Sequence, residues 1–155
     1  MGEYIHYGSD HFYRECFDKI RNNPMFTKPF GGFWASPLYV EYGWKDWCED
    51  EKFRECDEDN SFRFRLSKDA RVLDIRDVKD LEGLPKIKET IYRGVMNWVF
   101  LDFEKLALKY DAIELHLSEE RRVGLSPDSL YFKLYGWDCD SILIMNPDVV
   151  VEVSH

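Results

Sequence analysis

Two pairs of predicted strands follow one another in this chain with no helix between them, and this arrangement most restricts the fold. Residues 61–67 (SFRFRLS) alternate apolar and basic side chains, which is typical of a half-buried strand, and residues 70–76 (ARVLDIR) predict the next strand. Near the C-terminus, the apolar run at 141–147 (SILIMNP) is followed directly by 149–154 (VVVEVS). Because parallel neighbours need a long crossover, usually a helix, the sequence predicts a partly antiparallel sheet rather than a doubly wound parallel one.

Length and composition favour a single domain. The 155 residues match the commonest domain size, and the 45% of hydrophobic residues supply a core. With the strand order, they predict one α+β domain over residues 1–155, with a mostly antiparallel sheet flanked by helices. The other predicted elements are a first strand at 3–9, a helix at 11–22 capped by Asp10, a short aromatic strand that ends at Pro37, an acidic helix at 43–59, a long helical region from Pro85 to Tyr110, a strand at 111–118 and a helix at 126–136 capped by Ser126.

The charge balance restricts the partners. The formal net charge is -9, and such an acidic surface repels phosphate backbones, so non-specific binding of nucleic acid is disfavoured.

No apolar run approaches the roughly 18 residues of a membrane span, and the N-terminus lacks the basic and apolar regions of a secretory signal. The 4 cysteines form no Cys-x-x-Cys pair, so we expect reduced thiols, no metal site and a cytoplasmic protein.

Several conspicuous residues have structural interpretations when each is considered alone. His6 and His116 lie on predicted strands among apolar residues, where a histidine is usually structural. The acidic run at 48–59 (CEDEKFRECDED) is typical of a solvated helix face, and its acids lack the spacing of a calcium loop. A metal-dependent hydrolase built on His6, His11 and this run is a third functional interpretation, after the two given below.

The C-terminal third holds the most informative group of residues. Asp138 and Asp140 precede the apolar strand at 141–147 and lie close in sequence to several aromatic residues. Carboxylates at a strand end beside an aromatic pocket are typical of general-base or hydroxyl-orienting groups. These two aspartates are therefore candidates for a catalytic role.

Four stretches, taken in order, resemble the NAD-dependent ADP-ribosyltransferases, in the branch of diphtheria toxin and the poly-ADP-ribose polymerases. Residues 109–113 (KYDAI) and 141–150 (SILIMNPDVV) resemble that family's "yDgI" strand and its glutamate-bearing strand of the form EYVVFNPDQI. Residues 5–9 (IHYGS) resemble the family's first strand, and residues 31–37 (GGFWASP) resemble its second. The resemblance implies an ADP-ribosyltransferase-like split sheet and NAD as the substrate.

The resemblance also implies roles for single residues. In that family the first strand holds the adenosine-side ribose and the nicotinamide amide, which implies His6 or Tyr7 here, with Ser9 beside them. Alignment without a gap puts Tyr7 at the family's histidine position, and neighbours on a strand point to opposite sides, so only one of the two faces the ligand. Trp34 stands where an aromatic residue stacks on nicotinamide, and Ser36 supports the pocket.

The main departure from the family is at the position of its catalytic glutamate. Alignment on Asn-Pro puts Ser141 at the position of the glutamate that orients the nicotinamide-ribose hydroxyl, with Asp140 beside it. An aspartate is shorter by one carbon–carbon bond, about 1.5 Å, and a misplacement of that size can reduce a rate about 10²-fold. We expect Asp140 as the catalytic carboxylate, with Asp138 and Glu114 as alternatives.

Two functions follow from the resemblance. The first is an enzyme that cleaves the nicotinamide–ribose bond of NAD and transfers ADP-ribose to an acceptor that the sequence does not identify. The alternative is a catalytically inactive protein of the same fold, encoded in a bacterial or phage genome, that binds a protein or a nucleotide through its aromatic cleft.

Overall fold

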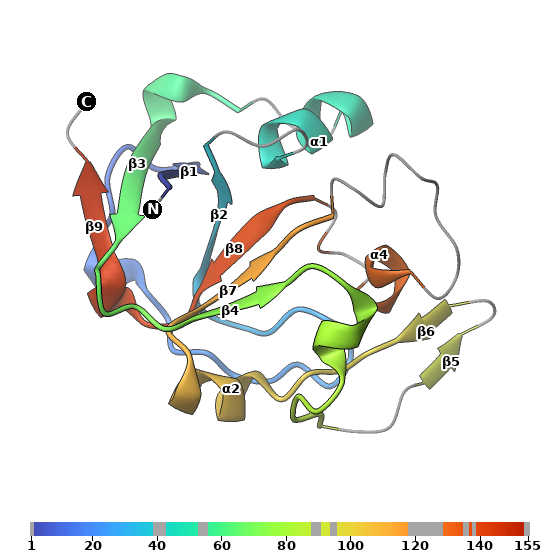
Figure 1. Cartoon of the computed structure of the whole chain (residues 1–155). Helices are drawn as coiled ribbons and strands as arrows, with labels where there is room; N and C mark the ends of the chain where they lie inside the picture. The colour runs from blue at the N-terminus through green and yellow to red at the C-terminus, as the bar shows by residue number, and fades with distance from the viewer. Residues whose placement is uncertain are drawn as a thin grey trace.

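The computed structural model describes residues 2–38, 43–52, 56–87, 91–93, 96–117, 129–134, 137 and 139–153. Within these residues, a seven-stranded sheet has the order β4-β7-β8-β2-β1-β3-β9, and a separate two-stranded sheet pairs β5 with β6 (Figure 1). The strands are β1 (Tyr4–Tyr7), β2 (Phe33–Pro37), β3 (Ser61–Leu66), β4 (Val72–Ile75), β5 (Ile91–Arg93), β6 (Met96–Trp98), β7 (Ala112–Leu115), β8 (Ser141–Ile144) and β9 (Val150–Val153).

The large sheet is mostly antiparallel, as predicted. Only β4 and β7 pair in parallel, while the five other neighbouring pairs are antiparallel. The strands that follow each other without a long helix, β3 with β4 and β8 with β9, are not neighbours, because β3 lies between β1 and β9, and β4 lies beside β7. The fold is therefore a mixed α+β domain with a mostly antiparallel sheet.

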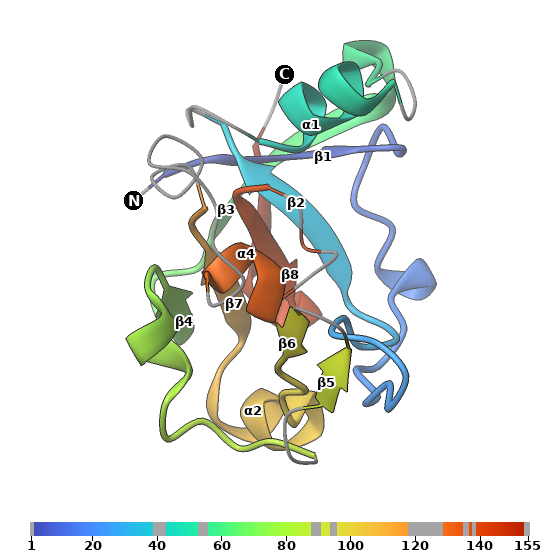
Figure 2. The same ribbon diagram turned by 90° about the vertical axis from the view of Figure 1, so that its right-hand side faces the viewer.

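Helices are short in the described part of the chain. They are α1 (Trp44–Glu51), α2 (Phe103–Lys109) and α4 (Leu130–Lys133), with 3₁₀ turns at Arg14–Cys16, Glu58–Asn60, Val78–Leu81 and Pro147–Val149. Figure 2 shows α4 in front of β7 and β8, and residues of α4 are buried in the same core as these strands. No helix among the described residues is long and apolar enough to cross a membrane.

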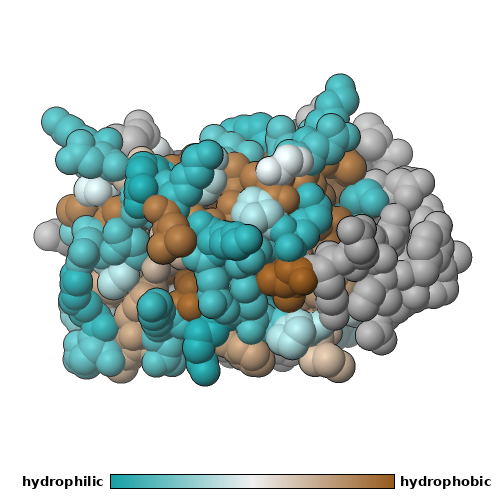
Figure 3. Space-filling view, turned by 90° about the horizontal axis from the view of Figure 1, so that it is seen from below, coloured by the Kyte–Doolittle hydropathy of each residue, from teal (hydrophilic) through white to brown (hydrophobic). Residues whose placement is uncertain are grey.

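Each face of the large sheet carries its own core. Core A contains Phe62, Phe64, Ile142 and Ile144, and core B contains residues of β4, β7, β8, α2 and α4 together with Trp137. Among the described residues, the exposed large hydrophobic side chains are Tyr13, Met25, Phe30, Leu108 and Val151, and Figure 3 shows hydrophilic and hydrophobic residues interspersed on the coloured part of one face. The two faces of the sheet are therefore named below by the core that each one carries.

The sheet curls around core A. The hydroxyl of Tyr4 on β1 donates a hydrogen bond to Glu114 on β7, although β2 and β8 lie between these strands. Three strand spacings amount to about 14 Å in a flat sheet, which is too far for these two side chains to meet. The contact therefore requires the curvature, and it brings the beginning of β1 toward β4 and β7.

The helix predicted at 11–22 is wrong. This segment contains only the 3₁₀ turn Arg14–Cys16, because its apolar residues serve both faces of the sheet. Phe12 and Phe17 pack against core A, whereas Ile20 is buried in core B. A helical stripe would direct Phe12 and Ile20 to one face, and a helix rises only about 1.5 Å per residue, so an extended chain makes the crossing instead.

The long helix predicted from Pro85 to Tyr110 is also wrong. It is replaced by β5, β6 and the short α2, whose beginning is fixed by Asp102, a cap that accepts a hydrogen bond from the Lys105 backbone N–H. The three consecutive residues 99–101 are all buried, which an amphipathic helix does not allow. The segment that contains them instead lies beside residues 85–87. The Asp102 backbone N–H donates a hydrogen bond to the Pro85 carbonyl at 2.8 Å.

Two other predicted helices are present but shorter. The acidic helix predicted at 43–59 corresponds to α1, which ends at Glu51 because Lys52 adopts a left-handed backbone conformation with φ 52°. The helix predicted at 126–136 corresponds to α4, and its predicted cap, Ser126, lies outside the described residues.

Candidate functional site

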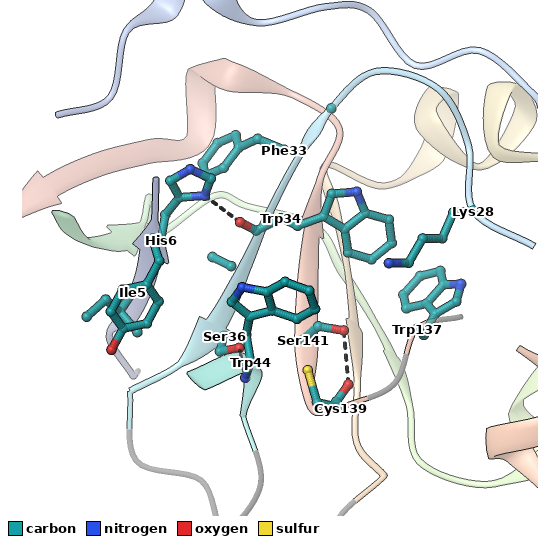
Figure 4. Close-up of a pocket in the computed structure, with 13 residues that line it drawn as sticks. Ile5, His6, Lys28, Phe33, Trp34, Ser36, Trp44, Trp137, Cys139 and Ser141 are labelled. Carbon is teal, nitrogen blue, oxygen red and sulfur yellow. Dashed lines mark hydrogen bonds between the residues drawn. The ribbon is translucent and has the colours of Figure 1, made fainter. Parts of the chain in front are cut away.

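A pocket of about 370 Å³ lies on the core B side of β1, β2 and β8 (Figure 4). A volume of this size is within the range of ligand pockets. The residues that line it come from β1, β2, the start of β8, α1 and two loops. They are Ile5, His6, Tyr7, Lys28, Gly32, Phe33, Trp34, Ala35, Ser36, Trp44, Trp137, Cys139 and Ser141.

Strand register places three of the predicted site residues on the pocket face. Ile5 of β1 is opposite Ser36 of β2, and residues two apart on a strand share a face. Tyr7 therefore lies on the same face as Ser36 and Trp34, and all three line the pocket. The sequence left open whether His6 or Tyr7 faces a ligand. In the structure, Tyr7 is the one on the strand face that forms the pocket.

The beginning of β8 completes the wall of the pocket. Trp34 is opposite Leu143, so Ser141, two residues earlier, also lies on the pocket face. The Ser141 hydroxyl donates a hydrogen bond to the Cys139 carbonyl at 3.2 Å. The resemblance puts a glutamate at this position, whereas the chain presents a small neutral hydroxyl.

Three indole rings and one ammonium group give the pocket its character. The rings of Trp34 and Trp137 meet edge to face with centroids 4.7 Å apart, and the Lys28 Nζ lies 4.8 Å from the Trp34 centroid. Trp44, at the start of α1, adds a third ring, which is stacked on Trp47 at 5.0 Å. Such a surface suits a planar aromatic ligand that carries negative charge, because rings stack on indole and the ammonium attracts an anion.

Ser36 is a buried hydroxyl that joins the parts of the pocket. Its Oγ accepts a hydrogen bond from the Trp44 backbone N–H at 2.9 Å and donates one to the Asp140 carbonyl at 3.1 Å. These two bonds connect β2 to the beginning of α1 and to the residue before β8. Ser36 therefore lines the pocket and also links three of its walls through these hydrogen bonds.

His6 and Ser9 lie away from the centre of the pocket. The His6 ring packs against Phe33 and Phe62, with centroids 5.4 and 5.3 Å away, and its Nδ1 is 2.6 Å from the Trp34 carbonyl oxygen. His6 borders the pocket but directs its ring toward core A (Figure 4). Ser9 lines a second hollow of about 330 Å³, and its hydroxyl donates to the His11 carbonyl at 2.7 Å.

Asp140, the candidate carboxylate next to β8 that the structure describes, is not among the residues that line the pocket. Asp140 is only 3% exposed, and its Oδ1 accepts a hydrogen bond from the Leu117 backbone N–H at 2.6 Å. This contact ties the end of the β7 segment to the start of β8. Asp138 lies outside the described residues.

Glu114 lies on the opposite face of the sheet, in a polar cluster of its own. Its register partner on β8 is Ile142, which is buried in core A, and its carboxylate contacts Tyr4 and His116. Burial raises the pKa of Glu114, but hydrogen bonds from His116 and Tyr4 outweigh burial and lower this pKa overall. The hydrogen bond to Glu114 raises the pKa of His116, and burial with the same carboxylate raises the pKa of the Tyr4 hydroxyl.

The two motifs of the C-terminal half meet at a buried carboxylate. Asp111, from KYDAI, accepts hydrogen bonds from Arg71 and from the Asn146 side chain, whose Nδ2 is 3.0 Å away. The Asp111 carbonyl also accepts from the backbone N–H groups of Met145 and Asn146. In this chain, these motif residues hold β7 and β8 together at the end remote from the pocket.

Lys28, Trp44 and Trp137, which give the pocket much of its character, were not predicted as site residues. Lys28 lies in an irregular loop, Trp44 lies at the start of α1, and Trp137 lies between α4 and β8. The local sequence around these residues contains no ligand-binding motif. The compositional signal of an aromatic pocket was the aromatic content of 16%, which includes 5 tryptophans.

Comparisons of the chain with protein-family models, with curated proteins and with solved structures found no match.

Proposed function

We propose that the chain is a nucleotide-binding module that holds NAD, or a nucleotide of the same chemical class, in the pocket between β1, β2, β8 and α1. The strands that carry the first, second and glutamate-strand motifs are neighbours in the sheet, in the order β8-β2-β1. This adjacency supports an ADP-ribosyltransferase-like split sheet as the origin of the pocket. The indoles would stack on the planar ring of the ligand, and Lys28 would attract its phosphates.

The observation that carries the proposal is the nature of the residue at the glutamate position. Ser141 faces the pocket there, and none of the described residues that line the pocket is acidic. The carboxylates of Asp140 and Glu114 are engaged with Leu117 and with Tyr4 and His116, respectively. A serine hydroxyl has no charge with which to stabilise an oxocarbenium-like transition state, so we propose binding without ADP-ribosyl transfer.

Titration with NAD, with ADP-ribose and with nicotinamide tests this proposal. Because three indoles line the pocket, we expect each productive ligand to quench tryptophan fluorescence, and calorimetry gives the affinity. Trp34→Ala should weaken binding about tenfold or more, since stacking of a base on an aromatic ring is worth about 1–3 kcal/mol. Trp98→Ala is the matched control, because Trp98 packs against Phe26 and does not line the pocket.

Release of nicotinamide from NAD separates the binding module from the transferase. We expect no release above the rate without protein. Release that disappears in Asp138→Asn or Asp140→Ala would instead establish the enzyme, with the carboxylate that the sequence analysis predicts. Equal affinity of wild type and Trp34→Ala for all three ligands would refute a nucleotide site in this pocket.

A further inference from the structure

On the core A side of the sheet, away from the pocket, one histidine and two carboxylates converge. The structure assigns Asp74, Glu114 and His116 to a binding site for a divalent first-row transition metal such as Zn²⁺. Their ligand atoms, one from each side chain, all lie within 4.8 Å of one another. The site is independent of the proposed nucleotide pocket, since none of these residues lines that pocket.

The convergence follows from the parallel pairing of β4 and β7. Asp74 and Glu114 are register partners, so their side chains leave neighbouring strands at the same level and on the same face. His116 is two residues after Glu114 and returns to that face. The ladder continues to this point, because the His116 backbone N–H donates to the Ile75 carbonyl at 2.9 Å. All three ligands are thus fixed by backbone hydrogen bonds rather than carried on loops.

The distances are close to those of a coordination sphere. The His116 Nε2 is 2.8 Å from a Glu114 oxygen and 3.6 Å from an Asp74 oxygen. Ligands at about 2.0–2.1 Å from a tetrahedral ion lie about 3.3 Å from each other, so small side-chain rotations suffice to admit the metal. One imidazole nitrogen with two carboxylate oxygens suits borderline ions such as Zn²⁺ better than Mg²⁺, which prefers oxygen ligands alone.

Burial and the surroundings of the cluster also fit a metal site. The side chains of Glu114 and His116 are 13% and 20% exposed, whereas that of Asp74 is 54% exposed. The ion would be held from one side and would keep water on the other. The Tyr4 hydroxyl donates to the second oxygen of Glu114, and a hydrogen bond of this kind orients a ligating carboxylate. Tyr4 is therefore a positioning residue.

Zn²⁺ affinity of the full chain, measured by competition with a chromogenic chelator, tests the site. All proteins carry Cys16→Ser, because Cys16 is an exposed thiol and thiolates bind Zn²⁺. We expect one Zn²⁺ per chain, no comparable binding of Mg²⁺, and a loss of affinity of roughly 100-fold in Asp74→Asn and in His116→Gln. Tyr4→Phe should weaken binding about tenfold, because it removes only the orienting hydrogen bond.

His11→Gln is the matched control. His11 also contacts a glutamate, Glu152, at 2.6 Å, but among the described residues it belongs to no group of three possible ligands. This variant should bind Zn²⁺ like the parent protein. Absence of stoichiometric binding, or equal affinity in the parent, Asp74→Asn and His11→Gln, overturns the inference. Asp74 is largely exposed, so its variant keeps the fold and decides the question even if His116→Gln unfolds.

Discussion

Replacement of Asp111 by asparagine gives a stability change whose dependence on pH can be worked from the structure. Asp111 is 5% exposed, and its carboxylate accepts hydrogen bonds from the Arg71 backbone N–H at 2.8 Å, from the Arg71 side chain and from Asn146. Burial raises the pKa of this carboxyl, but these hydrogen bonds outweigh burial and lower it from 3.8 to about 2. The charged form is therefore the one that the fold stabilises.

The size and sign of the effect follow from this pKa. Each pH unit between the unfolded and folded pKa is worth about 1.4 kcal/mol, so ionised Asp111 contributes about 2.5 kcal/mol at neutral pH. Because the folded pKa lies below the unfolded one, this contribution is fully present above about pH 4 and is lost as the pH falls toward 2. The asparagine side chain in Asp111→Asn cannot carry the charge, so the difference between the two proteins must shrink in acid.

Urea unfolding followed by tryptophan fluorescence measures the difference. At pH 6, Asp111→Asn should unfold with a free energy at least about 2.5 kcal/mol lower than wild type, and at pH 2.5 the gap should be about 1.5 kcal/mol smaller. Asp148→Asn is the control, because its exposed ion pair with Arg14 should contribute less than about 1 kcal/mol. A gap for Asp111→Asn that is equal at both pH values refutes the reasoning.

Two further changes test the packing. Gly31→Ala should lower the free energy of unfolding by about 2–4 kcal/mol, because the residue has φ +78° and its Cβ would lie 2.2 Å from the Lys19 carbonyl oxygen. Gly83→Ala is the control, with φ +76° but open space, and should lower it by only about 1 kcal/mol. Equal urea midpoints for the two variants would contradict the close contact at Gly31. Phe64→Ala changes a fully buried position of core A and should lower the free energy of unfolding by about 3–5 kcal/mol in the same assay. Leu108→Ala is the control, because this position is 81% exposed, and it should change stability by less than about 0.5 kcal/mol. A small effect of Phe64→Ala would mean that core A is poorly packed.

Strands of the large sheet were predictable where their signal is local, whereas β5 and β6 were missed. The alternation in 61–67 appears as β3 with its arginines outward, and the apolar run that begins at Ile142 appears in the fully buried β8. Helices were overpredicted because a periodic apolar pattern does not show whether the side chains pack on one face of the sheet or on both. The segment at 11–22 supplies side chains to both cores, and residues 99–101 are buried one after another, so in each case tertiary packing overrides the pattern.

The candidate site divides in the same way. That Trp34 and Ser36 share a strand face was predictable from the side-chain period of two, whereas the sequence left the choice between His6 and Tyr7 open. Lys28 and Trp137 were not predictable, because each comes from an irregular segment that only the folded chain brings to the pocket. The metal-ligand cluster was hidden for a further reason. Its ligands come from β4 and β7, and their parallel pairing cannot be read from strands that lie about forty residues apart.

The placement of the motif residues bears on what a resemblance of this kind can support. Asp111 and Asn146, which supply the most specific letters of the C-terminal motifs, bond to each other and join β7 to β8. This connection has a structural role that does not depend on whether the protein is an enzyme. These motif residues therefore account for a strand arrangement, and our proposal of binding without transfer rests instead on Ser141, which lines the pocket. Function in this chain has to be argued from that position and from the indoles around it.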